Sequence, residues 1–175
     1  MALLRGIGPT NPNMRNEKLR GVFEDLGFDN VRTVITTGNV LFDSPSAAMR
    51  TFETRVEEAL PKQLGFSSTT IIRSKKQLQD LLDSAALKRQ VRSGNTNLDI
   101  TFFKTKPREK PPLPYRPRDA DYTILALGDR AVCSVGDPTS STSDYMRWIE
   151  KRFGKEITTR TYTTVERILK RLSEG

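Results

Sequence analysis

The sequence predicts an α+β fold of two tandem ferredoxin-like βαββαβ repeats, each with an antiparallel sheet. Segments with strand and helix periodicity follow the order β-α-β-β-α-β over residues 1–74, and this order returns from residue 97 with one helix missing. A Gly-Asn or Gly-Asp pair separates the second and third strand segments of each repeat, which indicates a hairpin. The interval from this hairpin glycine to the glycine after the last helix is 27 residues for Gly38 to Gly65 and 26 for Gly128 to Gly154.

Local periodicity places the elements of the first repeat. In chain order, its strands and helices are expected at residues 2–7, 14–26, 31–35, 40–42, 45–64 and 68–72. Asn13 is the expected N-cap of the first helix, and Gly27 is its expected stop. Pro61 is expected to kink or interrupt the second helix, because proline lacks a backbone donor and crowds the preceding turn.

A linking helix and the second repeat follow. The pattern predicts the linking helix at 75–84, strands at 98–103, 122–127, 131–135 and 157–160, and a helix at 145–153. Five prolines within residues 104–118 exclude a regular helix there. A final helix is expected at 163–172, opened by a capping box of Thr163 and Glu166. The expected domains are repeat one, the link, repeat two and the C-terminal helix, at residues 1–74, 75–96, 97–160 and 161–175.

The chain is basic, and its charge is uneven along the sequence. The formal net charge of the 175 residues is +8. Residues 1–85 hold 11 Lys+Arg against 10 Asp+Glu, whereas residues 86–175 hold 18 against 11. A basic half favours an anionic partner, and nucleic acid is the first candidate. The alternative is a positive charge that serves solubility alone.

The residue types exclude several chemistries. With no histidine and one cysteine, the chain lacks a disulfide framework, a structural zinc site and any Ser-His or Cys-His nucleophile. No acidic cluster is spaced for magnesium, so we expect no metal, no cofactor and no catalytic residue. Cys133 alternates with apolar neighbours and is expected in the core. No apolar run approaches the ~20 residues that span a bilayer, so we expect a cytoplasmic protein without a membrane partner.

Three motifs in order resemble a known bacterial family. They are Ala2-Leu3-Leu4-Arg5-Gly6-Ile7, Thr36-Thr37-Gly38-Asn39-Val40-Leu41-Phe42, and Thr158-Thr159-Arg160 followed by Thr163-Thr164-Val165. The chain resembles the domain-of-unknown-function family 1697 over nearly its whole length. This resemblance implies a duplicated ferredoxin-like architecture and implies no activity. The chain departs from the family pattern in the loop at residues 8–13 and in the proline-rich stretch, where relatives tend to carry a glycine-rich, lysine-bearing loop and a helix.

Two segments have the composition of an anion site. Arg5, Gly6 and Gly8 lie between a strand and a helix, where backbone amides can surround an anion. The second segment lies near the C-terminus, where an expected helix start provides free amides and nearby side chains provide hydroxyls and a guanidinium. Its residues are Thr158, Thr159, Arg160 and Thr163. The structural alternatives are a tight turn in the first case and a strand that caps a helix in the second.

A third candidate is a basic surface for a phosphate backbone. Its residues are Lys88, Arg89, Arg92, Lys104, Lys106, Arg108, Lys110, Arg116 and Arg118. The alternative is a solvated basic loop, since Tyr115 is the one aromatic residue within the proline-rich part.

The leading functional hypothesis is a non-enzymatic binding protein for an anionic partner, with nucleic acid slightly favoured over other polyanions. A second hypothesis is a binding protein or enzyme that holds a phosphate or carboxylate ligand with Arg5 and Arg160. A third is a homo-oligomeric assembly module that pairs open sheets of two copies.

Overall fold

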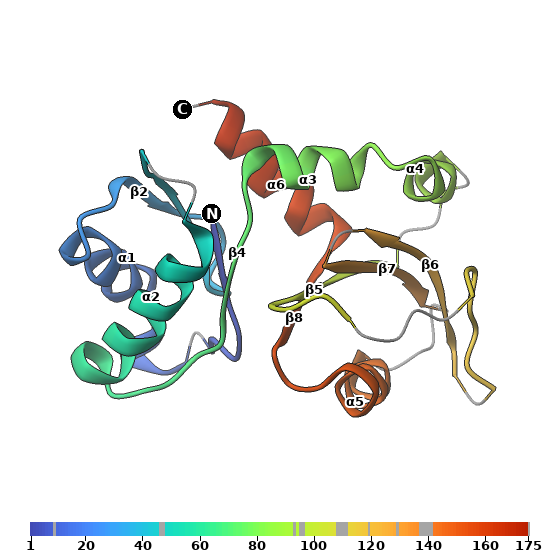
Figure 1. Ribbon diagram of the computed structural model, residues 1–175, viewed down its shortest axis with the longest axis horizontal. Coiled ribbons are helices and arrows are strands. Elements are labelled where there is room, and N and C mark those ends of the chain that lie inside the picture. Colours follow the sequence, from blue (N-terminus) through green and yellow to red (C-terminus); the bar gives the residue numbers. More distant parts are fainter. Residues whose placement is uncertain are drawn as a thin grey trace. The chain divides into compact units, whose positions relative to one another are not determined.

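The computed structural model describes residues 1–8, 10–45, 48–92, 94, 97–107, 112–118, 120–128, 130–136 and 142–174. Its chain divides into two compact units. One unit comprises Met1–Lys75 together with Arg167–Gly175, and the other comprises Lys76–Glu166. Each unit contains one four-stranded sheet (Figure 1).

The first unit has the βαββαβ order that the sequence predicts. Its elements are β1 (Ala2–Leu4), α1 (Asn16–Asp25), β2 (Asp29–Thr33), β3 (Asn39–Asp43), α2 (Met49–Leu64) and β4 (Thr70–Ile72), with a 3-10 turn, η1 (Pro12–Met14), before α1. The strands pair antiparallel in the order β2-β3-β1-β4. Helices α1 and α2 cover one face of this sheet, where their apolar side chains pack on Ala2, Leu4, Val40 and Phe42.

The second unit repeats this topology. Its elements are α3 (Lys75–Leu82), α4 (Ala85–Arg92), β5 (Leu98–Phe103), β6 (Tyr122–Gly128), β7 (Ala131–Gly136), α5 (Thr142–Phe153), β8 (Ile157–Thr161) and the start of α6 (Tyr162–Ser173). Its strands pair antiparallel in the order β6-β7-β5-β8, which is the first order with each strand replaced by its counterpart. The predicted tandem ferredoxin-like fold is therefore confirmed.

The proline-rich segment between β5 and β6 stands where the first unit has helix α1. No helix is present in the described residues between β5 and β6. Instead, Tyr115 exchanges two backbone hydrogen bonds with Ile124 on edge strand β6, with N···O distances of 2.9 and 2.8 Å. Tyr115 and Ala120 also pack against the apolar cluster beneath α5. This segment therefore closes a sheet edge and covers the core that a helix would have covered.

Several predicted element ends differ from the structure. Helix α2 continues through the exposed Pro61 to Leu64, so the proline removes one helical donor without ending the helix. Asn13 lies within the 3-10 turn, and α1 begins only at Asn16. The link forms the two helices α3 and α4 rather than one.

The final helix also starts earlier than predicted. It begins at Tyr162, and the Thr164 amide donates to the Thr161 hydroxyl over 3.2 Å. The cap is therefore Thr161, and the predicted capping box of Thr163 and Glu166 is wrong. Several threonines in this run could cap the helix. Strand β8 extends through Thr161, so Thr161 is the residue that directly precedes the helix and caps it.

Gly38 and Asn39 build the turn between β2 and β3. Gly38 has φ +75°, and a Cβ added there would lie 2.5 Å from Ile7 Cγ1 and 3.0 Å from Leu4 Cβ. The fully buried Asn39 side chain donates to the Val34 carbonyl over 2.9 Å. This part of the second family-like motif therefore has a structural role.

We expect Gly38→Ala to destabilise the chain by about 2–4 kcal/mol. Alanine is strained at this positive φ, and its methyl group would clash with the side chains of Ile7 and Leu4. The matched control is Gly21→Ala in α1, where φ is ordinary and the added methyl meets nothing within 4 Å. That change is expected to stabilise by about 0.5–1 kcal/mol. Urea denaturation of the three proteins measures both effects, and equal stability of Gly38→Ala and wild type would contradict this reading of the turn.

The outer edge of β4 is closed by carboxylates from α2. The Thr70 amide donates to Glu57 Oε1 and the Ile72 amide donates to Glu53 Oε1, both over 2.8 Å. Glu53 is 1% exposed. These bonds occupy backbone N–H groups that could otherwise donate to the carbonyls of another strand.

Glu53→Ala is expected to lower the free energy of unfolding by about 1–3 kcal/mol, because it leaves the buried Ile72 amide without an acceptor. Glu58→Ala, an exposed glutamate on the same helix, serves as the control and should change stability by less than about 0.5 kcal/mol. Thermal or urea unfolding distinguishes the two. If both variants were equally stable, the carboxylate would have no role at this edge.

Candidate functional site

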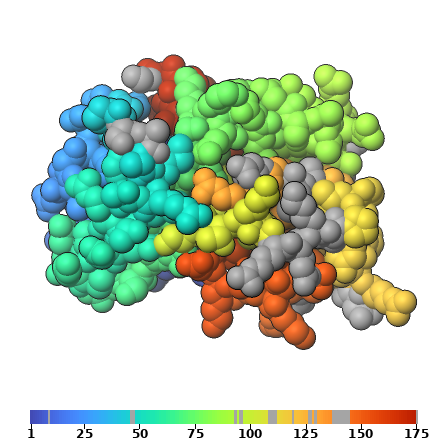
Figure 2. Space-filling view, in the orientation of Figure 1, coloured from blue at the N-terminus to red at the C-terminus, as the bar shows by residue number. Residues whose placement is uncertain are grey.

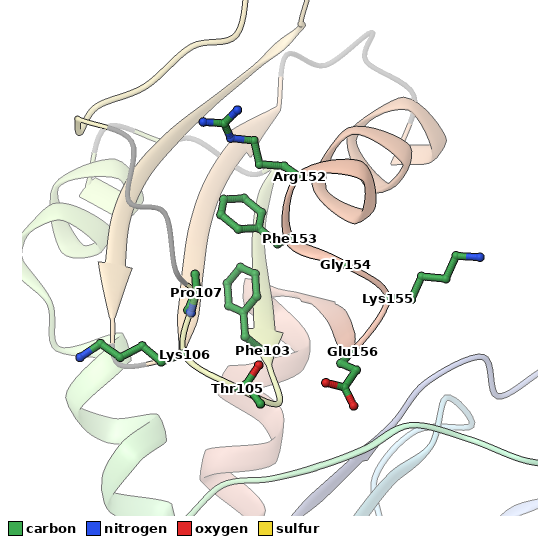
Figure 3. A pocket seen from close by; sticks show the side chains of 9 residues that line it. All are labelled: Phe103, Thr105, Lys106, Pro107, Arg152, Phe153, Gly154, Lys155 and Glu156. Atoms are coloured by element: carbon green, nitrogen blue, oxygen red, sulfur yellow. The ribbon is translucent and has the colours of Figure 1, made fainter.

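A cavity opens in the second unit where β5 and α5 both end. Its volume is 490 Å³. The segment after β5 and the turn between α5 and β8 line it (Figure 3), and atoms with the yellow and orange colours of these segments lie at the surface in Figure 2. It is lined by Phe103, Thr105, Lys106, Pro107, Arg152, Phe153, Gly154, Lys155 and Glu156.

Two aromatic rings form the centre of this cavity. Phe103 is the last residue of β5, and Phe153 is the last residue of α5. The two rings meet edge to face with their centroids 5.1 Å apart. Phe103 is buried, whereas Phe153 keeps part of its surface exposed. Phe153 also contacts Trp148, with the ring centroids 6.1 Å apart.

Three cations are among the residues that line the cavity. The side chains of Lys106, Arg152 and Lys155 extend from the rim on different sides, and all three residues are exposed (Figure 3). Glu156 opposes them with one negative charge, which leaves a net +2 among the lining residues. The C-terminal end of α5 adds about half a negative charge. The cations therefore outweigh the groups that would repel an anion.

The aromatic support that the sequence lacks within the proline-rich stretch comes from other elements. Tyr115 contacts Trp148 at 6.0 Å between ring centroids, and Trp148 contacts Tyr122 at 5.6 Å. Tyr115 and Trp148 are half-buried. A row of partly accessible rings thus leads from the proline-rich segment to Phe153. Rings beside cations can stack bases while the cations contact phosphates.

The structure divides the predicted basic surface. Lys106 lies at the cavity, and Arg116 and Arg118 are exposed on the same proline-rich segment. Lys104 is half-buried and extends the sheet through a 3.0 Å backbone bond to Glu156. Two further predicted residues, Arg108 and Lys110, lie outside the described residues.

The other three predicted cations lie on α4, which covers the sheet face opposite α5 (Figure 1). Lys88 forms a 2.7 Å ion pair with Asp83, and Arg89 and Arg92 are exposed in the last turn. A ligand bound at the cavity therefore does not contact the three α4 cations of the predicted basic surface, because they lie on the other face of the sheet.

The predicted anion site near the C-terminus has internal partners. The Arg160 guanidinium donates to the Thr158 hydroxyl and to the Thr159 carbonyl, both over 2.8 Å. Its withdrawal from water lowers the pKa of Arg160 to about 10, so it remains charged at neutral pH. Thr163 is exposed in the first turn of α6. These contacts tie Arg160 to its own strand, and its role in binding stays a prediction.

In the loop after β1, two backbone amides already donate hydrogen bonds within the protein. The Gly8 amide donates to Met14 Sδ over 3.3 Å, and the Arg5 amide donates to the Thr69 carbonyl over 3.0 Å. Gly6 has φ +70°, as a tight turn requires. Arg5 and Arg160 belong to different units. An anion site at Arg5, Gly6 and Gly8 stays a prediction.

Hydroxyls form a buried chain on the α5 side of the second sheet. The Thr101 hydroxyl lies 2.7 Å from the Tyr145 hydroxyl and 2.8 Å from that of Thr159. Burial raises the pKa of Tyr145 to about 12, so this phenol stays protonated. In the described part of the chain, no three His, Cys, Asp or Glu side chains converge to hold a metal ion. The described helices also include none with the length and apolar character needed to cross a bilayer.

The sequence analysis missed Arg152, Phe153 and Lys155. The signal available was a basic helix end with an aromatic residue before Gly154, which is also a common way to end a helix. Nothing in the sequence pairs this segment with Lys106. The antiparallel pairing of β5 with β8 brings the two together.

The charge balance differs when it is counted by structural unit instead of by sequence half. Counted by unit, the first holds 13 Lys+Arg against 9 Asp+Glu, and the second holds 16 against 12. Each unit thus carries +4. The asymmetry along the sequence disappears because the end of α6 places Arg167, Lys170 and Arg171 in the first unit.

Comparison with known proteins assigns a family. The model of the family described as "Protein of unknown function (DUF1697)" matches residues 1–133. The chain belongs to this family. The matched segment contains the first two of the three motifs noted above, and Thr158–Thr159–Arg160 lies beyond it.

The fold of this DUF1697 protein has a solved counterpart. The conserved bacterial protein SP0830 from Streptococcus pneumoniae is similar with a TM-score of 0.75 and 18% sequence identity. The similarity covers 98% of this chain and 96% of that chain, so both repeats and α6 share the architecture. No curated protein sequence matches the DUF1697 chain.

Cys133 supplies a test of the second core. It is 1% exposed, and burial raises the pKa of its thiol to about 12 from an ordinary value of 9.0. Between these two values the unfolded chain releases a proton that the folded chain retains, so stability falls as pH rises. We expect the free energy of unfolding to drop by about 1 kcal/mol more in wild type than in Cys133→Val between pH 8 and pH 10. Parallel urea titrations measure this difference, and identical pH dependence would place the thiol in contact with water.

Proposed function

We propose that this DUF1697 protein is a binding protein for single-stranded nucleic acid, and that the cavity of the second unit is its contact site. The observation that carries this proposal is the convergence of Phe153, a partly exposed ring, with the cations Lys106 and Arg152. The three residues come from two segments that lie far apart in the sequence.

The two kinds of group match the two parts of a nucleotide. Stacking of one base on an aromatic ring contributes about 1–3 kcal/mol, and it accepts any base. Lysine and arginine side chains contact the phosphates, and the release of counterions makes that contribution dependent on salt. Lys106 and Arg152 are exposed near Phe153, so a base on the ring and phosphates on the cations belong to one short strand.

The recessed rings favour a single strand over a duplex. The bases of a duplex stack on one another and pair at their edges, so their faces do not reach a ring in a cavity. An unpaired base can enter the 490 Å³ space between the cationic rim residues. Binding through backbone phosphates and a stacked base needs no catalytic group.

The experiment is fluorescence anisotropy with labelled 12-nucleotide single-stranded DNA and RNA at two salt concentrations. Phe153→Leu, which keeps an apolar side chain but removes the ring, is expected to weaken binding by about tenfold, in line with the loss of one stacked base. Lys106→Gln with Arg152→Gln is expected to reduce the slope of log affinity against log salt by roughly 1.4.

The matched control is Lys151→Gln, an exposed cation in the same turn of α5 that does not line the cavity. It should change affinity by less than about twofold. The single variant Arg152→Gln is measured beside it, and equal effects of Lys151→Gln and Arg152→Gln would show only general charge attraction. Absence of binding at low salt would sink the proposal.

A further inference from the structure

A second cavity lies wholly within the first unit, between strand β2 and the last turns of α6. Its volume is 710 Å³, and nothing in the proposed function involves it. It is lined by Arg20, Val31, Arg32, Thr33, Val34, Ile35, Leu41, Arg167, Lys170, Arg171 and Glu174.

Three elements contribute cations to this cavity. Arg20 comes from α1 and Arg32 from β2, while α6 supplies the group Arg167, Lys170 and Arg171. The three α6 residues follow i, i+3, i+4 spacing, which places them on one side of the helix. With Glu174 as the one carboxylate in the lining, the net charge is +4. The C-terminal end of α6 opposes this with about half a charge, so the cavity stays cationic.

The carboxylates of the described residues neutralise these cations incompletely. Glu174 is shared by Lys170 and Arg171, at 3.9 and 3.3 Å. Arg20 pairs with Glu24 over 3.3 Å, and both side chains are about half exposed. Such exposed pairs are weak and exchange readily with another anion.

Arg32 adds an unmet donor. Its Nε is buried and has no hydrogen-bond partner in the described structure. A buried donor of a charged group costs free energy until an acceptor reaches it. Guanidinium groups fit the oxygens of phosphate in a fork geometry, and three further guanidinium groups line the same cavity.

Apart from Thr33, the rest of the lining is apolar. Leu41 is fully buried at this cavity, and Val31, Val34 and Ile35 also line it. Ile35 is exposed and has φ +60°, a conformation that a β-branched residue rarely adopts. A ligand with a phosphate at one end and an apolar or aromatic body at the other would satisfy both parts of the cavity. The volume is within the range of roughly 300–1,000 Å³ that small-molecule sites occupy.

We propose that this cavity is a second, independent site, which binds a small phosphate monoester with an apolar or aromatic body through Arg32 and the α6 cations.

The test is isothermal titration of the full chain with adenosine 5′-monophosphate, and separately with adenosine and with inorganic phosphate. The monoester is expected to bind more tightly than either part alone, with saturation at one site. Arg32→Gln is expected to weaken it by about tenfold or more, as the loss of a charge-assisted pair does. Lys170→Gln with Arg171→Gln, whose side chains are 79% and 68% exposed, tests the same site without touching a buried group.

Arg50→Gln is the matched control, because Arg50 is an exposed arginine of the same unit outside the cavity. It should leave the affinity within about twofold of wild type. Equal losses in Arg32→Gln and Arg50→Gln, or no saturable binding of any of the three probes and no vesicle binding, would overturn the proposal.

Two further arms separate this site from others. Phe153→Leu should leave binding of the monoester unchanged, and Arg32→Gln should leave binding of single-stranded DNA unchanged, so either proposal can fail alone. Sedimentation with vesicles containing phosphatidic acid tests a lipid as the source of the phosphate monoester. Vesicle binding that Arg32→Gln abolishes, without binding of the free nucleotide, supports the same site with a lipid ligand.

Discussion

A four-stranded antiparallel sheet has two faces and two edges, and each must be covered or kept from pairing with another strand. In the first unit, α1 and α2 cover one face, and two glutamates of α2 occupy the outward amides of edge strand β4. In the second unit no helix lies between β5 and β6 in the described residues, so the same requirement is met differently. Tyr115 pairs with edge strand β6 and packs beneath α5. The other features of this unit depend on that replacement.

A proline-rich segment covers a sheet less completely than a helix does. Beside this segment, the rings of Tyr115, Trp148 and Phe153 keep part of their surface exposed. The segment also brings Lys106 beside the end of α5, where Arg152 and Lys155 already lie. Accessible rings and exposed cations meet at one place as a result. This combination separates the second repeat from the first, where the rings of Phe23, Phe28, Phe42 and Phe52 form a buried cluster.

The last helix links the charge of the chain to its fold. Its first turns belong to the second unit and its last turns to the first. Arg167, Lys170 and Arg171, which lie in the basic C-terminal part of the sequence, therefore line a cavity of the first unit together with Arg20 and Arg32. Both units carry the same net charge, and each has a cavity in which cations outnumber carboxylates. The two cavities differ in chemistry, since one offers aromatic rings and the other arginine groups above aliphatic side chains.

The sequence by itself determined the repeat, the strand order within it and the positions of the turn glycines, because periodicity and positive-φ residues are local properties. Gly38, Gly65 and Gly154 all lie at the predicted breaks with φ between +74° and +85°. The tertiary structure alone decided which cations share a site. Lys106 and Arg152 meet because β5 pairs with β8, and Arg32 meets Arg171 because α6 returns to the first unit. Such contacts join residues more than 40 positions apart, and no local pattern encodes them.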